Sequence, residues 1–168
     1  MKQVVVVGGT GLVGRELLRQ LHDRSGVTCT ALVRREGIVG QLSDRVREVR
    51  FDFDNPNHYA RLGTDIPCDV FLCALGTTLR KAGDAERFRD IDFGIPMRFL
   101  DRLRRLDPKP LVGLVSSAGA DRPRGLYLRV KAELERALLD SGLPYVIVRP
   151  GLLLGEREEP RPLERLAS

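Results

Sequence analysis

The chain alternates short apolar runs with longer amphipathic stretches. The short runs are rich in Val, Leu and Ile, which is typical of parallel strands buried on both faces of a sheet. They predict six strands, at residues 3–7, 27–33, 46–51, 69–74, 111–116 and 145–149. Parallel strands need a crossover between them, so we expect helices in the stretches between the runs.

Apolar residues between the runs recur with the period of a helix, 3.6 residues. They predict helices over 12–23, 85–106 and 126–141. The second helix is expected to be broken near Gly94 and Pro96, and the polar segments 35–45 and 52–64 to be connections or short helices over the sheet edge. This alternation predicts an α/β fold: a three-layer α/β/α Rossmann fold with a doubly wound parallel sheet in the strand order 3-2-1-4-5-6.

A glycine-rich turn follows the first predicted strand. It consists of Gly8, Gly9, Thr10, Gly11, Leu12, Val13 and Gly14. Glycine at every third position allows a tight turn, a close approach of the backbone to a pyrophosphate, and close packing of helix on strand. The free N–H groups at the start of the next helix would face the phosphates. Because the turn joins a predicted strand to a predicted helix, it predicts a dinucleotide-binding site.

The second predicted strand ends in Arg34 and Arg35, where a carboxylate would normally accept the ribose hydroxyls of NAD. Two guanidinium groups favour a 2′-phosphate, so we predict that NADP(H) is preferred over NAD(H). A solvated strand end is the alternative interpretation, and the neighbouring Glu36 leaves an NAD-type site open. Asp52 is placed after the third strand to receive the adenine amino group, although a turn-forming Asp accounts for it nearly as well.

Ser117 ends the fifth predicted strand, and Tyr127 and Lys131 lie on the helix after it. The spacing of four places Tyr127 and Lys131 on one helical face. An ordinary phenol, with a pKa of about 10, cannot exchange protons at neutral pH unless a nearby cation stabilises its phenolate. We predict that Lys131 supplies that charge and holds the nicotinamide ribose, that Tyr127 transfers the proton, and that Ser117 binds the substrate carbonyl. A Tyr-x-x-x-Lys pair in isolation would be a surface pair.

Five segments of the chain carry a resemblance to a known superfamily. They are 8–14, 73–78 with Lys81-Ala82-Gly83, 116–121, 127–131 and 149–154. On these segments the chain resembles the short-chain dehydrogenase/reductase superfamily over essentially its whole length. More narrowly, it resembles the atypical, NADPH-binding branch typified by the HIV Tat-interacting protein.

This resemblance implies further cofactor contacts. They lie at Leu75 and Gly76 beside the cofactor, at Arg34 and Arg35 around its 2′-phosphate, and at Leu153 and Arg161 in the last loop. The resemblance also implies an active-site Asn on the preceding helix. That Asn is absent here, and Asp92 is a poor substitute for it.

Length and composition fit a single domain of ordinary size. The chain has 168 residues, of which 42% are hydrophobic, and a domain of this size buries about 70% of the surface that its unfolded chain exposes. We predict one NAD(P)-binding Rossmann domain over 1–168. The composition changes after residue 150, and we expect 151–168 to begin a C-terminal substrate or lid segment that is cut short.

Charges of both signs are interleaved along the chain, with 28 Lys and Arg against 23 Asp and Glu and a net charge of +5. Such a dispersed excess is typical of a solvated surface. Aromatic residues make up 5% of the chain and Trp is absent, so base stacking has little support and we expect no nucleic-acid partner. We expect a small-molecule carbonyl substrate or a protein partner, and the oligomeric state stays open.

The apolar run at 4–7 is too short to span a bilayer and has no signal-peptide cleavage site behind it. We therefore expect no membrane segment and a cytoplasmic location. The spacing between Cys68 and Cys73 is not that of a zinc site, and His22 and His58 are far apart. We expect reduced thiols and no metal.

These observations favour an NADP(H)-binding oxidoreductase of the atypical short-chain type, which reduces a small carbonyl by hydride transfer. The alternative is a catalytically weak or inactive NADPH-sensing protein that regulates or binds a protein partner, as the missing Asn suggests. Epimerase or dehydratase chemistry on a nucleotide sugar needs a substrate lobe, for which the residues after Pro150 leave no room.

Overall fold

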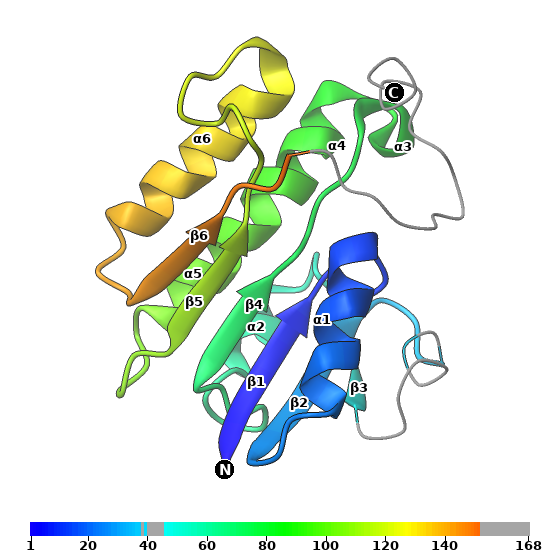
Figure 1. The fold of residues 1–168 in the computed structure, drawn as a ribbon, viewed down its shortest axis with the longest axis vertical. Helices are drawn as coiled ribbons and strands as arrows, with labels where there is room; N and C mark the ends of the chain where they lie inside the picture. Colours follow the sequence, from blue (N-terminus) through cyan, green and yellow to red (C-terminus); the bar gives the residue numbers. More distant parts are fainter. Residues whose placement is uncertain (38, 40–45, 152–168) are drawn as a thin grey trace.

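A six-stranded parallel sheet forms the centre of the molecule (Figure 1). The computed structural model describes residues 1–37, 39 and 46–151. Its strands are β1 (Lys2–Val7), β2 (Val27–Val33), β3 (Val46–Arg50), β4 (Val70–Cys73), β5 (Leu111–Val115) and β6 (Tyr145–Val148). They lie in the order β3-β2-β1-β4-β5-β6, which confirms the predicted Rossmann fold and strand order. Because every ladder is parallel, all carboxyl ends meet at one edge of the sheet.

Helices cover the sheet between the strands. They are α1 (Leu12–His22), α2 (Pro56–Ala60), α3 (Leu79–Ala82), α4 (Ala85–Arg89), α5 (Ile95–Leu103) and α6 (Gly125–Leu139). The predicted break near Gly94 is a π-helical turn, Asp90–Gly94, which joins α4 directly to α5. Helix α3 was not predicted, because four residues are too few to show a helical period.

The two faces of the sheet bury separate apolar clusters. Along β1, Val4 and Val6 pack on the side of α1, while Val5 and Val7 pack with residues of α2, α5 and α6. In Figure 1, α1 lies in front of the sheet, with α2 and α5 behind it. Both faces of β1 are therefore covered, as the continuous run of valines requires.

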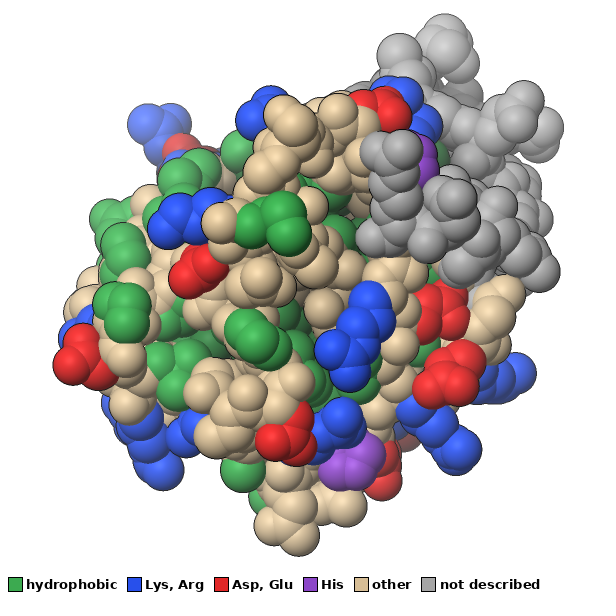
Figure 2. All heavy atoms as spheres, turned by 90° about the horizontal axis from the view of Figure 1, so that it is seen from below, with side chains coloured by type: hydrophobic (Ala, Val, Ile, Leu, Met, Phe, Trp, Pro, Cys, Tyr) green, Lys and Arg blue, Asp and Glu red, His purple; other side chains and the backbone are tan. Residues whose placement is uncertain are grey.

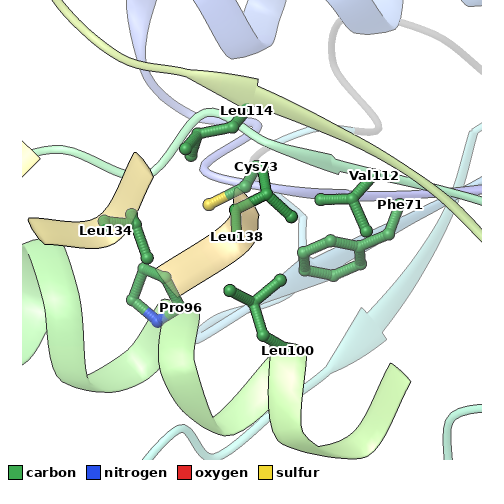
Figure 3. A pocket seen from close by; sticks show the side chains of 8 residues that line it. All are labelled: Phe71, Cys73, Pro96, Leu100, Val112, Leu114, Leu134 and Leu138. Carbon is green, nitrogen blue, oxygen red and sulfur yellow. The ribbon is translucent and has the colours of Figure 1, made fainter. Parts of the chain in front are cut away.

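Aromatic rings fill the space between β3, β4, α2 and α5. The ring centroid of Phe99 lies 4.7 Å from that of Tyr59, 4.8 Å from that of Phe71 and 5.4 Å from that of Phe51. A void of about 10 Å³ remains nearby, lined by apolar residues of β4, β5, α5 and α6 (Figure 3). That volume holds one water at most, so the void is a packing gap and not a ligand site.

Strand β6 is less well covered than β1. Val146 and Val148 are 53% and 52% exposed, whereas Val5, Val6 and Val7 have no exposed surface. Its partner β5 buries Val112 and Leu114 on one face. The sheet is thus fully enclosed at its centre and open at the β6 edge of its described part.

Charged side chains of both signs lie next to one another on the surface at the amino ends of the strands (Figure 2). This face carries no large area of a single charge, in keeping with the interleaving seen in the sequence. Within the described residues, no helix is long and apolar enough to cross a membrane.

Candidate cofactor and catalytic site

The glycine turn lies between β1 and α1 and packs on the end of β4. Gly8 has a φ of +80°, and a Cβ on it would lie 2.5 Å from the carbonyl carbon of Ala74. A Cβ on Gly14 would lie 2.1 Å from the Gly8 carbonyl oxygen. The turn is closed by a hydrogen bond that the Gly11 amide donates to the Gly8 carbonyl, at 3.0 Å. Glycine is therefore required at positions 8 and 14 for steric reasons.

Helix α1 begins without a side-chain cap. Gly11 is its N-cap residue, and its first turn contains no acidic residue. Gly11 and Thr10 are exposed, while Leu12 and Val13 are partly buried. In the described part of the chain no side chain caps the first turn, whose N–H groups lie at the positive end of the helix dipole. This arrangement fits a pyrophosphate.

A cavity of about 520 Å³ lies at the carboxyl edge of the sheet, and one of its lining residues, Leu75, lies beside Gly8 of the turn. Its volume is within the range of small-molecule sites. The lining residues come from the ends of β2, β3 and β4, from α2 and from the α4–α5 helix: Arg34, Arg50, Phe51, Asp52, Phe53, Asp54, His58, Leu75, Arg87, Ile91 and Ile95. Three predicted cofactor residues, Arg34, Asp52 and Leu75, thus line one cavity, whereas Arg35 is exposed outside it.

Arg34 comes directly after β2, Arg50 is the last residue of β3, and these two strands are neighbours in the sheet. Arg50 pairs with Val33 in the parallel register, and the Phe51 amide donates to the Val33 carbonyl at 2.8 Å. Both arginines are exposed on the cavity, and no carboxylate of the described residues forms an ion pair with either. Two guanidinium groups on one cavity, without an ion-pair partner among the described residues, are candidates for binding a phosphate monoester.

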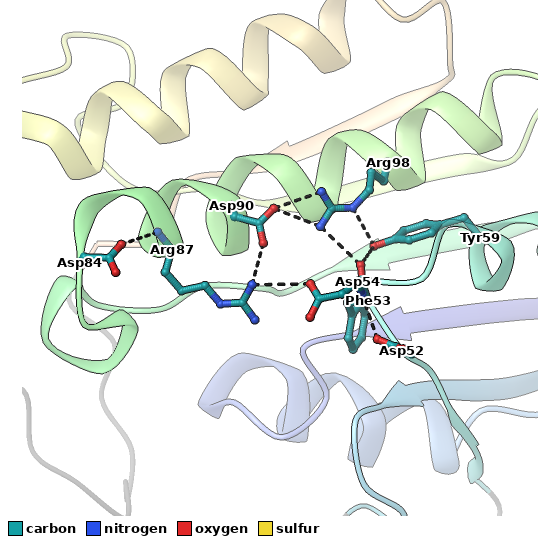
Figure 4. Close-up of polar contacts among 8 residues, drawn as sticks. All are labelled: Asp52, Phe53, Asp54, Tyr59, Asp84, Arg87, Asp90 and Arg98. Atoms are coloured by element: carbon teal, nitrogen blue, oxygen red, sulfur yellow. Dashed lines mark hydrogen bonds and ion pairs between the residues drawn. The ribbon is translucent and has the colours of Figure 1, made fainter.

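A network of charged side chains holds the opposite wall of the cavity (Figure 4). Arg87 lies between Asp90 and Asp54, with N–O distances of 3.0 and 3.6 Å. Arg98 contacts Asp90 at 3.1 Å and donates to the Tyr59 hydroxyl at 3.2 Å. Burial raises the pKa of Tyr59, whose hydroxyl in turn donates to the carbonyl of Phe53. The network ties the segment after β3 to α4 and α5.

Hydrogen bonds within the segment 52–58 also hold it in place. The Asp52 amide donates to Nδ1 of His58 at 2.9 Å, and the Asp54 amide donates to Asp52 Oδ1 at 3.0 Å. Asp52 therefore has the turn-forming contact that its sequence position allowed. Its carboxylate is exposed at the cavity and remains a candidate acceptor for the adenine amino group.

The predicted catalytic residues lie on β5 and α6. Ser117 follows β5 and is partly exposed. Tyr127 and Lys131 lie one turn apart on α6, with the Lys131 Nζ 5.9 Å from the centre of the Tyr127 ring. The Tyr127 ring also lies 6.1 Å from that of Phe88 on α4. The structure therefore brings Tyr127 and Lys131 together on the side of α6 that faces the α4–α5 helix.

Lys131 is buried and paired. Its Nζ lies 2.9 Å from Asp92 Oδ1, and the two side chains are 3% and 0% exposed. Lys131 also donates to the Leu75 carbonyl at 3.3 Å, and Asp92 Oδ2 accepts a 2.8 Å hydrogen bond from the Thr77 amide. Gly76 lies between these two backbone contacts and is exposed. The segment after β4 is thus held by both members of the ion pair.

Sequence reasoning missed Arg50 and underrated Asp92. Arg50 could have been found from the parallel register, because residues that end neighbouring strands meet at one edge. Asp92 follows Phe88 by four residues and precedes Ile95 and Phe99 at helical spacing. An acid on such an apolar stripe indicates a buried and paired charge.

Two predicted cofactor contacts, Leu153 and Arg161, lie outside the described residues, as does nearly all of the predicted lid segment 151–168. Their roles stay predictions.

The three cysteines are thiols in apolar surroundings. Burial raises the pKa of Cys29 and Cys68 to about 12 and that of Cys73 to about 11. Such thiols are poor nucleophiles and poor metal ligands. Among the described residues, no group of three or more His, Cys, Asp or Glu could hold a metal ion.

Comparison with known proteins agrees with this geometry. The profile of a family described as NAD(P)H-binding matches residues 8–165. The mitochondrial protein FMP52 of Candida albicans is 34% identical over 157 residues, which cover 92% of this chain and 68% of that protein. The mitochondrial protein fmp52 of Aspergillus niger is 33% identical, over 98% of this chain and 72% of that protein.

Among solved structures, the UDP-glucuronic acid 4-epimerase of Bacillus cereus in complex with NAD superposes with a TM-score of 0.75. It is 17% identical, and the match covers 94% of this chain and 58% of that chain. This likeness shows the fold. The present chain spans little more than half of the epimerase.

The predicted cytoplasmic location is contradicted by these relatives. The FMP52 proteins from several fungi are all named mitochondrial. The prediction rested on the short apolar run at the start of the chain, and neither the length of that run nor the fold specifies a compartment.

Proposed function

The chain belongs to the NAD(P)H-binding family, and from that premise we propose that it is an NADP(H)-dependent oxidoreductase that reduces a small carbonyl compound. The observation that carries the proposal is the joint arrangement at the carboxyl edge of the sheet. This edge carries an uncapped helix start, a cavity with two arginines that have no ion-pair partner among the described residues, and a Tyr–Lys pair. The narrower relation to the branch typified by the HIV Tat-interacting protein stays a prediction.

The adenosine half of the cofactor would occupy the cavity. We assign its 2′-phosphate to Arg34 together with Arg50, because both guanidinium groups line the cavity and lack a carboxylate partner in the described chain. Hydrogen bonds to a charged group contribute about 1.5–3 kcal/mol each. The proposed preference for NADP(H) over NAD(H) rests on this pair, with Arg35 as a further candidate.

The pyrophosphate would lie over residues 8–13, where backbone N–H groups are available and no side chain projects from the glycines. Leu75 and Gly76 would then continue the site from the end of β4 towards α6, and the nicotinamide would reach Tyr127 and Lys131. When bound, the cofactor supplies a hydride.

The chain's own residues would handle the proton. Tyr127 is partly exposed on α6 and would donate its hydroxyl proton to the carbonyl oxygen. Ser117, which is also partly exposed, would hydrogen-bond the same oxygen. Lys131 would hold the nicotinamide ribose through its ammonium group, which has three N–H donors and donates one of them to the Leu75 carbonyl.

Titration of the purified protein with NADPH and with NADH, followed by nucleotide fluorescence, tests the cofactor assignment. We expect NADPH to bind at least tenfold more tightly, and Arg34→Ala and Arg50→Ala each to remove most of that difference. Arg19→Ala, on the exposed Glu16 pair of α1, is the control and should leave both constants unchanged. Equal affinity for the two nucleotides in the parent protein would overturn the preference.

Turnover is tested by NADPH consumption against a panel of aldehydes and ketones. Tyr127→Phe removes the proton donor and should lower the rate by about 10²–10⁴-fold, with NADPH affinity retained. A Tyr127→Phe protein with unchanged turnover would refute the catalytic assignment.

A second candidate function is NADPH sensing without turnover. It is favoured by the ion pair of Lys131 with Asp92, because the positive charge that catalysis would use is already paired with a carboxylate. It predicts NADPH binding without carbonyl reduction, and a protein partner whose affinity changes with NADPH. Pull-down yields that ignore added NADPH would count against it.

A further inference from the structure

The buried ion pair of Asp92 and Lys131 goes beyond what proton transfer needs. In the proposed reaction only the lysine ammonium has a role, yet a fully buried carboxylate lies 2.9 Å from it. Both charges lie inside the protein, where an ammonium without a counter-charge is strongly disfavoured. Asp92 is therefore what permits a charged lysine at this depth.

The pair also fixes a segment of backbone. Lys131 forms an ion pair with Asp92 Oδ1 and donates a hydrogen bond to the Leu75 carbonyl. The second carboxylate oxygen accepts from the Thr77 amide. The two charged groups thus hold the chain on either side of Gly76, one through a carbonyl and the other through an amide.

Gly76 lies directly over the pair. A Cβ built on it would approach Lys131 Nζ at 3.6 Å and Asp92 Oδ1 at 3.7 Å. Gly76 is exposed, so its backbone, supported by the pair, forms an open surface at the end of β4. The cavity with Arg34 and Asp52 begins at the adjacent Leu75 and extends towards β3.

We infer that Asp92 is a positioning residue for the nicotinamide-ribose half of the dinucleotide. It holds the Lys131 ammonium and the Leu75–Thr77 backbone as one rigid surface against which that half lies. The inference rests on the proposed function. It adds that the two halves of the cofactor are recognised separately, because none of the contacts of Asp92 reaches Arg34, Arg50 or Asp52.

Two probes separate the halves. NADPH contains both, whereas adenosine 2′,5′-bisphosphate contains the 2′-phosphate and the adenosine and lacks the nicotinamide ribose. Asp92→Asn keeps the size of the side chain and removes its charge. We expect the NADPH affinity of Asp92→Asn to fall at least tenfold and its affinity for adenosine 2′,5′-bisphosphate to stay within twofold of the parent value, both measured by calorimetry.

Equal losses for both probes would assign Asp92 to the general integrity of the fold and would overturn the inference. Unchanged NADPH affinity would also overturn it. The control is Glu133→Gln, which removes the exposed partner of Arg89 on the same helix α6 and should change neither affinity.

Asp92→Asn leaves the Lys131 ammonium buried without a counter-charge, which is costly for folding. The double variant Asp92→Leu/Lys131→Met avoids this and provides a second test. It replaces both charges with apolar groups of similar size. We expect it to bind adenosine 2′,5′-bisphosphate like the parent and NADPH at least tenfold more weakly. Parental NADPH affinity, or loss of both affinities, would overturn the inference.

The outcomes also separate this inference from the proposed function. If the parent protein binds neither probe, the proposed function fails. If the parent binds both and the Asp92 variants behave like it, the inference fails alone.

Discussion

The centre of the sheet and its β6 edge are built from similar valine-rich strands, but they are packed differently. Every side chain from Val4 to Val7 is buried in β1, whereas Val146 and Val148 on β6 are about half exposed. The central strand has α1 on one face and α2, α5 and α6 on the other. Apolar sequence alone does not distinguish the two strands.

This difference in burial corresponds to two different proposed roles, pyrophosphate binding and catalysis. The turn between β1 and α1 needs glycines within van der Waals distance of β4, and such closeness is possible only where the elements are firmly packed. The proposed catalytic residues follow β5 and lie on α6, next to the open edge. The proposed pyrophosphate site thus lies in the most enclosed part of the molecule, and the proposed catalytic residues lie near the part that is least enclosed in the described structure.

The largest effect on stability is expected at the buried ion pair of Asp92 and Lys131. Lys131→Met leaves the Asp92 carboxylate buried without a counter-charge, which should lower the free energy of unfolding by about 3–5 kcal/mol. The double variant Asp92→Leu/Lys131→Met should recover most of this loss, because no lone charge remains. Urea unfolding measures both. Equal stability of the single and double variants would contradict the interpretation of a coupled pair.

The next effect is expected in the glycine turn. Gly14→Ala places a methyl group 2.1 Å from the Gly8 carbonyl oxygen, which should cost about 3 kcal/mol and abolish NADPH binding. Gly11→Ala is the matched control, since its Cβ would lie at an acceptable 3.4 Å and should cost about 1 kcal/mol through poorer capping. Thermal unfolding and nucleotide titration measure both. Similar losses for the two variants would refute the steric argument.

The contrast between the strands can be tested with one substitution at two places. Val6→Ala removes two fully buried methyl groups and should cost about 2 kcal/mol. Val146→Ala removes the same groups from a half-exposed position and should cost less than about 1 kcal/mol. Urea unfolding of the two variants decides the matter. A cost at Val146 as large as that at Val6 would show that the β6 edge is covered in solution.

The smallest effect concerns Glu135 and Arg149, which join α6 to the end of β6 at 2.6 Å. Burial alone would raise the pKa of Glu135, but the hydrogen bonds and charge of Arg149 lower it below its ordinary value. A lowered carboxyl pKa stabilises the folded state at neutral pH, and this contribution is lost as the pH falls below about 4.3.

Glu135→Gln should therefore lower stability at pH 7 by about 1 kcal/mol or less, because Arg149 is exposed and water screens the pair. The same variant should show a weaker loss of stability between pH 5 and pH 3 than the parent. Denaturant unfolding across this range measures the effect, and parallel pH profiles for the two proteins would contradict it.

Local sequence signals were sufficient for most of the fold. The six strands and three longer helices were predicted from apolar runs and helical periods, which depend on near neighbours. The glycine turn was predicted for the same reason, because the steric need for Gly8 and Gly14 arises within one strand–turn–helix unit. The sheet order followed from the Rossmann pattern of these units.

The parts that were missed depend on contacts between distant segments. Arg50 reaches the cavity only because β3 lies beside β2. Asp92 meets Lys131 across the π-helical turn, and although Gly94 and Pro96 marked a break there, they did not indicate that the turn brings Asp92 against α6. The sequence shows that residue 92 is an acid on an apolar stripe, but it does not show that Lys131 is its partner.

The π-helical turn Asp90–Gly94 has one more consequence. It contains two carboxylates separated by one residue, and they point in different directions, Asp92 towards Lys131 and Asp90 towards Arg87 and Arg98. One turn of helix thus contributes to both ends of the proposed cofactor site. Because each carboxylate has its own basic partners, we expect a substitution at one of them to leave the ion pairs of the other intact.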